Sequence, residues 1–137
     1  MAVAGAGAAL RLVGLLPSLL PTLVLALPAQ AATVLSIGDG DTLRVLEGGQ
    51  KMTIRLARID APEMAQAPFG AQSRALLTSL APVGTEVSLK VVATDRHGRS
   101  VAEILQGNRN VNLQMVRRGQ AFAYRQYLGN CNGTAYL

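Results

Sequence analysis

The stretch from Arg55 to Glu63, Arg-Leu-Ala-Arg-Ile-Asp-Ala-Pro-Glu, constrains the fold of this chain more than any other. An apolar strand would end there in two carboxylates separated by a proline. Pro62 has no N–H and fixes its own φ, so strand pairing should stop at it and leave Glu63 at a rigid corner. Alternation along one unbroken strand would place Arg55 and Asp60 on opposite faces. A guanidinium and two acids at a strand end suit a phosphate and a hard cation better than a protein core.

Two further charged clusters flank this stretch. Upstream, Asp39-Gly40-Asp41-Thr42 separates two apolar runs, and a glycine between two acids is typical of a tight turn. Downstream, Asp95-Arg96-His97-Gly98-Arg99 is a charged turn between two more strand-like runs. Taken alone, each cluster is most simply a surface turn, and Asp60-Ala61-Pro62-Glu63 alone could begin a helix. The first cluster is not an EF-hand, because Arg44 stands where that calcium loop needs glycine.

The first 31 residues are expected to be a signal segment that precedes one domain, residues 32–137. Arg11 is the only charge, residues 12–27 are almost wholly apolar, and Ala29-Gln30-Ala31 is typical of a cleavage site. A membrane anchor is the alternative, but three prolines interrupt the run before it reaches the ~18 residues of a span. We therefore expect export to a secreted or periplasmic location, with only transient membrane contact through the signal.

The charge balance favours polyanions without identifying one. The chain carries 13 basic and 8 acidic residues, a net charge of +5 to which Arg11 contributes one. Five arginines outside the three clusters are candidates for nonspecific phosphate contacts: Arg58, Arg74, Arg117, Arg118 and Arg125. Cys131 is the only cysteine, so an intrachain disulfide is excluded, and its thiol could be free or paired between chains.

Short apolar segments separated by turns predict an α+β fold that is mainly β. The expected strands are 33–37, 43–46, 52–59, 86–94 and 101–105, and the expected helices are 71–80 and 111–118. Gly119 is placed to end the second helix. Five strands with a helix after the third and a second short helix after the fifth favour a small closed barrel of the oligonucleotide/oligosaccharide-binding (OB) type.

Together, the three charged clusters resemble the thermonuclease (staphylococcal nuclease-like) family over roughly residues 32–127. Three ordered motifs at compatible spacing are far more specific than any one of them. The resemblance implies the same OB barrel and a hydrolase, a calcium-dependent endonuclease of the thermonuclease type. Such an enzyme would cleave the 5′ P–O bond in DNA and RNA and leave 3′-phosphate ends. It implies single-stranded or flexible nucleic acid as the partner and no stable protein partner.

The resemblance also implies a calcium site and a general base. Asp41 and Asp60 would bind Ca²⁺ through their carboxylates, and Ala61 would bind it through its backbone carbonyl. Many relatives have threonine at the position of Ala61, and a carbonyl ligand survives that change. Asp39 would support the loop from behind these ligands. Glu63 would take the proton from the attacking water.

The remaining implied roles concern the phosphate and the base of the substrate. Arg55 and Arg99 would hold phosphate oxygens and oppose the charge of the transition state. Tyr124 and Tyr127 lie where family tyrosines contact the nucleotide, and ordinary packing of Phe122 and a tyrosine on the barrel is the alternative. His97 is the only histidine, and we expect it to serve the turn rather than the chemistry.

The end of the chain leaves two alternatives to a nuclease open. Relatives usually continue into a long third helix, whereas this sequence ends at Leu137, where that helix would begin. We therefore expect the domain to be C-terminally truncated, which makes an unstable product one alternative. The other is a nucleic-acid-binding OB module without catalysis. Retention of Arg55, Glu63 and Arg99 favours the nuclease over that module.

Overall fold

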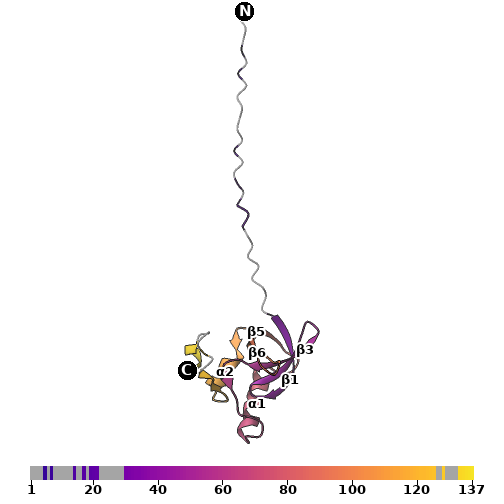
Figure 1. Ribbon diagram of the computed structural model, residues 1–137, viewed down its shortest axis with the longest axis vertical. Helices are drawn as coiled ribbons and strands as arrows, with labels where there is room; N and C mark the ends of the chain where they lie inside the picture. Colours follow the sequence, from indigo (N-terminus) through magenta and orange to yellow (C-terminus); the bar gives the residue numbers. More distant parts are fainter. Residues whose placement is uncertain are drawn as a thin grey trace, which may run out of the picture.

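The computed structural model describes residues 5, 7, 14, 17, 19–21, 30–125, 128 and 133–137 (Figure 1). Its strands are β1 (Gln30–Asp39), β2 (Thr42–Glu47), β3 (Gln50–Leu56), β4 (Ile59–Asp60), β5 (Glu86–Thr94), β6 (Ser100–Gln106), β7 (Arg109–Asn110) and β8 (Phe122–Ala123). Its helices are α1 (Phe69–Leu80), α2 (Val111–Arg117) and the short 3₁₀ helix η2 (Gly133–Tyr136).

The main sheet closes on itself. Its strand order is β3-β2-β1-β5-β6-β7, and β3 also pairs in parallel with β6, from Ile54 opposite Ser100 to Leu56 opposite Ala102. This extra pairing joins the two ends of the five long strands into a barrel. Apolar residues at alternate positions fill its interior, and Val45, Ile54 and Ile104 are fully buried. The predicted α+β fold with a five-stranded OB-type barrel is confirmed.

The two α-helices lie side by side against the barrel (Figure 1). Helix α1 begins at Phe69, two residues before the expected start, and buries Leu77 and Leu80. Helix α2 is capped by Asn110, whose side chain accepts a hydrogen bond from the Leu113 N–H at 3.1 Å. At its other end Gly119 has a φ of 71°, the left-handed conformation expected of a C-terminal glycine.

The third strand is not the continuous segment 52–59 that the sequence predicted. Strand β3 ends at Leu56, and Arg58 has a φ of 67°, so the chain turns before Ile59. The next strand, β4, pairs instead with β8, with Asp60 opposite Phe122. The turn breaks the two-residue alternation, and for this reason Arg55 and Asp60 share a side of the chain and form an ion pair. The prediction that they lie on opposite faces was wrong.

The N-terminal boundary of the barrel lies close to the expected cleavage site. Strand β1 begins at Gln30, and Gln30 and Ala31 pair with Leu89 and Ser88 of β5. Most of the expected signal segment lies outside the described residues. Among the described residues, no helix has the length and apolar character needed to cross a membrane.

Candidate functional site

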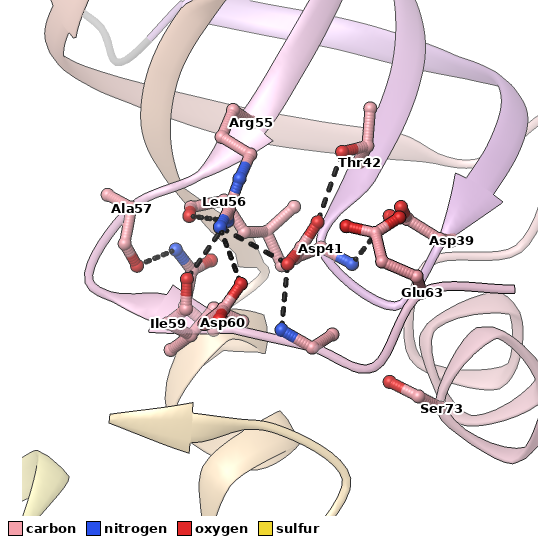
Figure 2. A network of polar contacts seen from close by, with 12 residues as sticks. Asp39, Asp41, Thr42, Arg55, Leu56, Ala57, Ile59, Asp60, Glu63 and Ser73 are labelled. Atoms are coloured by element: carbon pink, nitrogen blue, oxygen red, sulfur yellow. Dashed lines mark hydrogen bonds and ion pairs between the residues drawn. The ribbon is translucent and has the colours of Figure 1, made fainter. Parts of the chain in front are cut away.

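The turn between β1 and β2 carries the first two acids. Asp41 is only 4% exposed, and its Oδ2 accepts a hydrogen bond from the Ala61 N–H at 2.7 Å (Figure 2). Asp39 supports the turn, because its Oδ1 accepts the Asp41 N–H at 3.1 Å. Gly40 lies so close to α1 that a Cβ there would overlap the Ser73 hydroxyl. Because glycine has no Cβ, the backbone at Gly40 can approach α1 closely, and the acidic turn lies directly against the helix.

Arg55 joins the two acids that the sequence separates by 19 positions. Its Nη2 lies 3.2 Å from Asp41 Oδ2 and 3.2 Å from Asp60 Oδ1, and Figure 2 shows both carboxylates directed at the guanidinium. Its Nη1 donates to the backbone carbonyls of Leu56 and Ile59 at 2.9 Å each. The turn at residues 57–58 therefore wraps around one arginine, which fixes the two carboxylates beside it.

Burial sets the protonation of Asp41. The low polarity around its carboxylate disfavours the charged form and raises the pKa of Asp41 to about 6. Arg55 and the Ala61 N–H act in the opposite direction, but they do not cancel the effect of burial. The positive charge present at this position is therefore too weak to compensate a buried carboxylate fully.

Glu63 stands at the corner after Ala61 and Pro62, as predicted, and its side chain is exposed. In Figure 2 it extends toward the turn that carries Asp39 and Asp41. Its backbone is held firmly, because the Glu63 N–H donates to the Gln66 side chain and the Glu63 carbonyl accepts the Gln66 N–H. A Cβ at Gly70 would overlap that same Glu63 carbonyl, so the first turn of α1 packs directly on the backbone of this corner.

Arg99 lines the same cleft as Arg55. Asp95 Oδ2 accepts from Arg99 Nε at 2.7 Å, and Asp95 Oδ1 accepts the Arg99 backbone N–H at 2.9 Å. Burial opposes ionisation of Asp95, but the hydrogen bonds from Arg99 and His97 outweigh it and lower the pKa of Asp95. The cleft has a volume of about 410 Å³, and Arg55, Arg99 and Tyr124 all line it.

The remaining residues suggested by the sequence differ in where the structure places them. Tyr124 is 40% exposed and lines the cleft, whereas Tyr127 lies outside the described residues, as does Cys131. Phe122 is 75% exposed, so the alternative in which it packs on the barrel is wrong. His97 is an exposed residue of the β5–β6 turn and donates its backbone N–H to Asp95. The suggested phosphate arginines Arg74, Arg117, Arg118 and Arg125 are exposed.

Arg58 does not belong with those exposed arginines, and its suggested contact with phosphate in solvent was wrong. It is 6% exposed, and its Nη1 lies 2.7 Å from Oε1 of Glu103, which is itself 8% exposed. Glu103 also accepts hydrogen bonds from Asn110 Nδ2 and from the Tyr136 hydroxyl. The positive φ of Arg58 turns its side chain inward, and no feature of the local sequence pattern signals such a turn.

Sequence reasoning also missed Asn112, a fully buried side chain at the start of α2. Its Oδ1 accepts the Ile104 N–H at 3.0 Å, and its Nδ2 donates to the carbonyls of Ala57 and Ala102 at 3.0 Å each. One side chain thus fixes α2, β6 and the turn behind Arg55. A polar residue at an apolar helix position was the available signal, because buried polar groups in native proteins are hydrogen-bonded.

The donors expected for a cation are partly assembled. In the part of the chain that the structure describes, no group of three or more His, Cys, Asp or Glu side chains is arranged to hold a metal ion. Two carboxylates, Asp41 and Asp60, do converge on a single nitrogen of Arg55. Ala61 contacts Asp41 through its N–H, and its carbonyl is the additional oxygen predicted as a ligand.

The fold and this site define an OB-barrel domain whose acidic and arginine-rich surface is typical of phosphate chemistry. Residues 53–136 match the family model described as "Staphylococcal nuclease homologue", and the chain belongs to this family. The resemblance inferred from the three charged clusters is thereby confirmed.

Curated relatives agree with this assignment. The chain is 44% identical over 95 residues to an "Uncharacterized endonuclease" of Haemophilus influenzae, covering 69% of this chain and 52% of that protein. It is 40% identical over 117 residues to a "Micrococcal nuclease" of Shigella flexneri, covering 77% and 66%. It is 38% identical over 95 residues to an "Uncharacterized endonuclease" of Escherichia coli O157:H7, covering 69% and 61%. The matched region thus spans about half to two thirds of each relative.

Proposed function

We propose that this chain is a calcium-dependent nuclease that hydrolyses phosphodiester bonds of DNA and RNA. The observation that carries the proposal is the convergence of Asp41 and Asp60 on Arg55, beside a cleft that Arg55 shares with Arg99. The nuclease names of the relatives support the same reaction class. The expected cut is at the 5′ P–O bond, which leaves a 3′-phosphate.

The chain's own residues supply the proton transfer and hold the phosphate. Glu63 is exposed at a rigid corner, where it takes a proton from a water molecule as the water oxygen bonds to phosphorus. The bond to the 5′ oxygen breaks, and that oxygen takes a proton from solvent. Arg55 and Arg99 hold the phosphate oxygens and stabilise the negative charge that develops on them.

Asp41, Asp60 and the Ala61 carbonyl would hold the calcium ion. Calcium prefers oxygen ligands, and these residues offer two carboxylates and a carbonyl. The elevated pKa of Asp41 fits a buried carboxylate that lacks sufficient positive charge around it. When bound, calcium supplies positive charge next to the phosphate.

We also propose that the domain is exported, with residues 1–31 removed as a signal. The support comes from the sequence alone: one charge, an apolar run and a small-residue cleavage motif ahead of the barrel. Expression of the full chain in a bacterial host tests this. N-terminal sequencing of exported protein should begin at Ala32, and recovery only of membrane-bound protein with Met1 intact would contradict it.

Glu63→Gln tests the assigned chemistry, because glutamine keeps the shape of the side chain but cannot accept the proton. General base catalysis contributes roughly 10²–10⁴-fold, so turnover of single-stranded DNA should fall by that order. Calcium-dependent binding of a nucleotide, measured by titration calorimetry, should be preserved. End-labelling of the wild-type products should detect 3′-phosphates.

Glu86→Gln is a matched control, because Glu86 is an exposed glutamate at the start of β5 and lines neither the cleft nor the acidic turn. It should leave turnover unchanged. Cleavage by Glu63→Gln at the wild-type rate would remove Glu63 from the mechanism. A folded wild-type chain that binds nucleic acid without cutting it would instead support the non-catalytic binding module.

A further inference from the structure

A second groove lies beside the corner that carries Glu63. Its chemistry differs from that of the cleft lined by Arg55 and Arg99, here called the arginine-lined cleft. The groove has a volume of about 550 Å³. The described residues that line it are uncharged: Pro62, Gln66, Phe69, Gln72, Gly119, Gln120, Ala121 and Phe122. Two of them are exposed aromatic residues, Phe69 at 61% and Phe122 at 75%. Exposed phenylalanines beside glutamines offer stacking and hydrogen bonds but no charge.

Strand pairing places Phe122 beside the acidic site. Phe122 of β8 is the direct partner of Asp60 in β4, and side chains of directly opposed residues project from the same face with Cβ atoms about 5 Å apart. Asp60 is the carboxylate paired with Arg55. The groove also lies next to the Glu63 corner, because Pro62, which lines the groove, immediately precedes Glu63.

Phe122 and Tyr124 line two different hollows next to the Asp60–Arg55 pair. They are two residues apart, with Ala123 between them paired to the buried Ile59. Tyr124 lines the arginine-lined cleft, and Phe122 lines the uncharged groove. The Asp60–Arg55 pair adjoins both hollows, because Phe122 is the strand partner of Asp60 and Arg55 lines the cleft.

We infer that the uncharged groove is a subsite for an unpaired nucleobase of the substrate, with Phe122 as its stacking platform. The inference rests on the proposed nuclease function and specifies its substrate as single-stranded nucleic acid that crosses the site in an extended form. The base next to the scissile phosphate stacks on Phe122 and Phe69, while the glutamines contact its edge. A paired base cannot enter, because stacking on a protein ring requires the base to leave its own stack.

The sharpest test combines Phe122→Ala with a series of short oligodeoxynucleotides, each lacking one base at a different position around a fixed cleavage site. Stacking on an aromatic side chain contributes a sizeable part of the binding free energy of each base. On the intact oligonucleotide, Phe122→Ala should therefore lower kcat/KM by about tenfold. One abasic position should lower the wild-type kcat/KM by a similar factor and leave the variant unaffected. Phe122→Trp should retain wild-type values.

Val83→Ala is the matched control, because Val83 is a 59%-exposed apolar residue that lines neither groove. It should behave as wild type on every oligonucleotide. Anisotropy of fluorescein-labelled oligonucleotides, measured with Glu63→Gln to prevent cleavage, should show the same position-specific loss for an added Phe122→Ala substitution.

Two outcomes separate the inference from the function on which it rests. If the wild type cleaves but Phe122→Ala loses nothing, or loses equally at every abasic position, the subsite is overturned while the nuclease stands. If the wild type does not cleave, the proposed function fails, and the anisotropy series still decides whether a base occupies the groove. Protection of Phe122 by another segment of the chain or by a second copy would appear as binding insensitive to every abasic position, which overturns the inference.

Discussion

Arg55 occupies a position where its charge serves two carboxylates at once. Its single Nη2 atom is within 3.2 Å of both Asp41 and Asp60, while its Nη1 holds the turn behind it through two carbonyls. The arginine is therefore both a structural clamp and a candidate phosphate ligand. Burial keeps the pKa of Asp41 near 6 despite this contact, so Arg55 does not fully offset the cost of ionising this buried carboxylate.

Asp41→Asn should change how the stability of the metal-free protein depends on pH. The pKa of Asp41 is about 6 in the folded state and 3.8 in its ordinary state, so the folded state holds the extra proton between these values. Its contribution to stability is fully present below about pH 4 and is lost as pH rises through about 6. At neutral pH the penalty in the wild type should be on the order of 2–3 kcal/mol.

Urea unfolding of both proteins in EGTA, from about pH 4 to about pH 7, measures this effect. The free energy of unfolding of the wild type should fall relative to Asp41→Asn across that range. Equal slopes, or a wild type that gains stability relative to the variant as pH rises, would mean that Asp41 is not held in a low-polarity environment.

At the scale of elements, helix α1 is the part that positions the acidic turn and the Glu63 corner together. Ser73, fully buried, donates its hydroxyl to the Gln120 carbonyl at 2.6 Å and lies against Gly40. Gly70 lies against the Glu63 carbonyl one turn earlier. Two small positions, three residues apart on one face of the helix, thus allow the backbone of both site loops to approach it.

Gly70→Ala should lower turnover strongly in a protein that still folds. The added Cβ would overlap the Glu63 carbonyl, so the corner must move away from the helix. A displacement of about 1 Å at a catalytic group can reduce the rate about 100-fold. Kinetics on single-stranded DNA, with circular dichroism to verify folding, checks this. Ala71→Ser, at the next and exposed position of α1, should retain activity, and an active Gly70→Ala would show that the corner tolerates the shift.

The elements also show where sequence patterns stop being informative. Alternating apolar residues predicted the long strands, and helical spacing predicted both helices to within two residues. The third strand failed because alternation assumes an extended backbone, whereas Arg58 adopts a positive φ that only tertiary contacts stabilise. Its guanidinium meets Glu103, 45 positions later, and its carbonyl accepts the Tyr124 N–H at 2.7 Å. Neither partner is visible in a local window of sequence.

At the scale of the whole molecule, a buried polar network links the barrel to the C-terminal segment. Arg58 and Glu103 form a buried ion pair, and the Tyr136 hydroxyl of η2 donates to the same glutamate at 3.4 Å. Tyr136 is 6% exposed and belongs to the main apolar core. The described residues at the end of the chain therefore contribute to the fold of the domain.

Tyr136 should be important for stability mainly through its ring. Removing a large buried aromatic side chain costs about 3–5 kcal/mol, whereas losing one hydrogen bond to a charged group costs about 1.5–3 kcal/mol, and this bond is long. We therefore expect Tyr136→Ala to lower the free energy of unfolding by several kcal/mol and Tyr136→Phe to lower it by a smaller amount, near the low end of that range. Urea unfolding followed by circular dichroism checks both. A Tyr136→Ala protein as stable as the wild type would mean that η2 does not pack on the barrel in solution.

The sequence predicted which residues form the candidate site, but it did not predict the contacts between them. The order of the three charged clusters identified Asp41, Arg55, Asp60, Glu63 and Arg99 as candidates, because the closed barrel brings strand ends together. It could not show that Arg55 bridges the two acids, since that contact depends on the turn at Arg58. It also could not show that Phe122 is exposed next to Asp60, because this follows from the β4–β8 pairing.

Digestion of single-stranded DNA by the purified chain, with calcium and with EGTA, tests the central claim most directly. Circular dichroism of the same sample establishes whether the chain is folded. We expect cleavage with calcium, none with EGTA, and restoration when calcium is returned. Equal cleavage in EGTA would contradict the calcium requirement, and a folded chain that leaves the DNA intact in calcium would contradict the proposed nuclease activity itself.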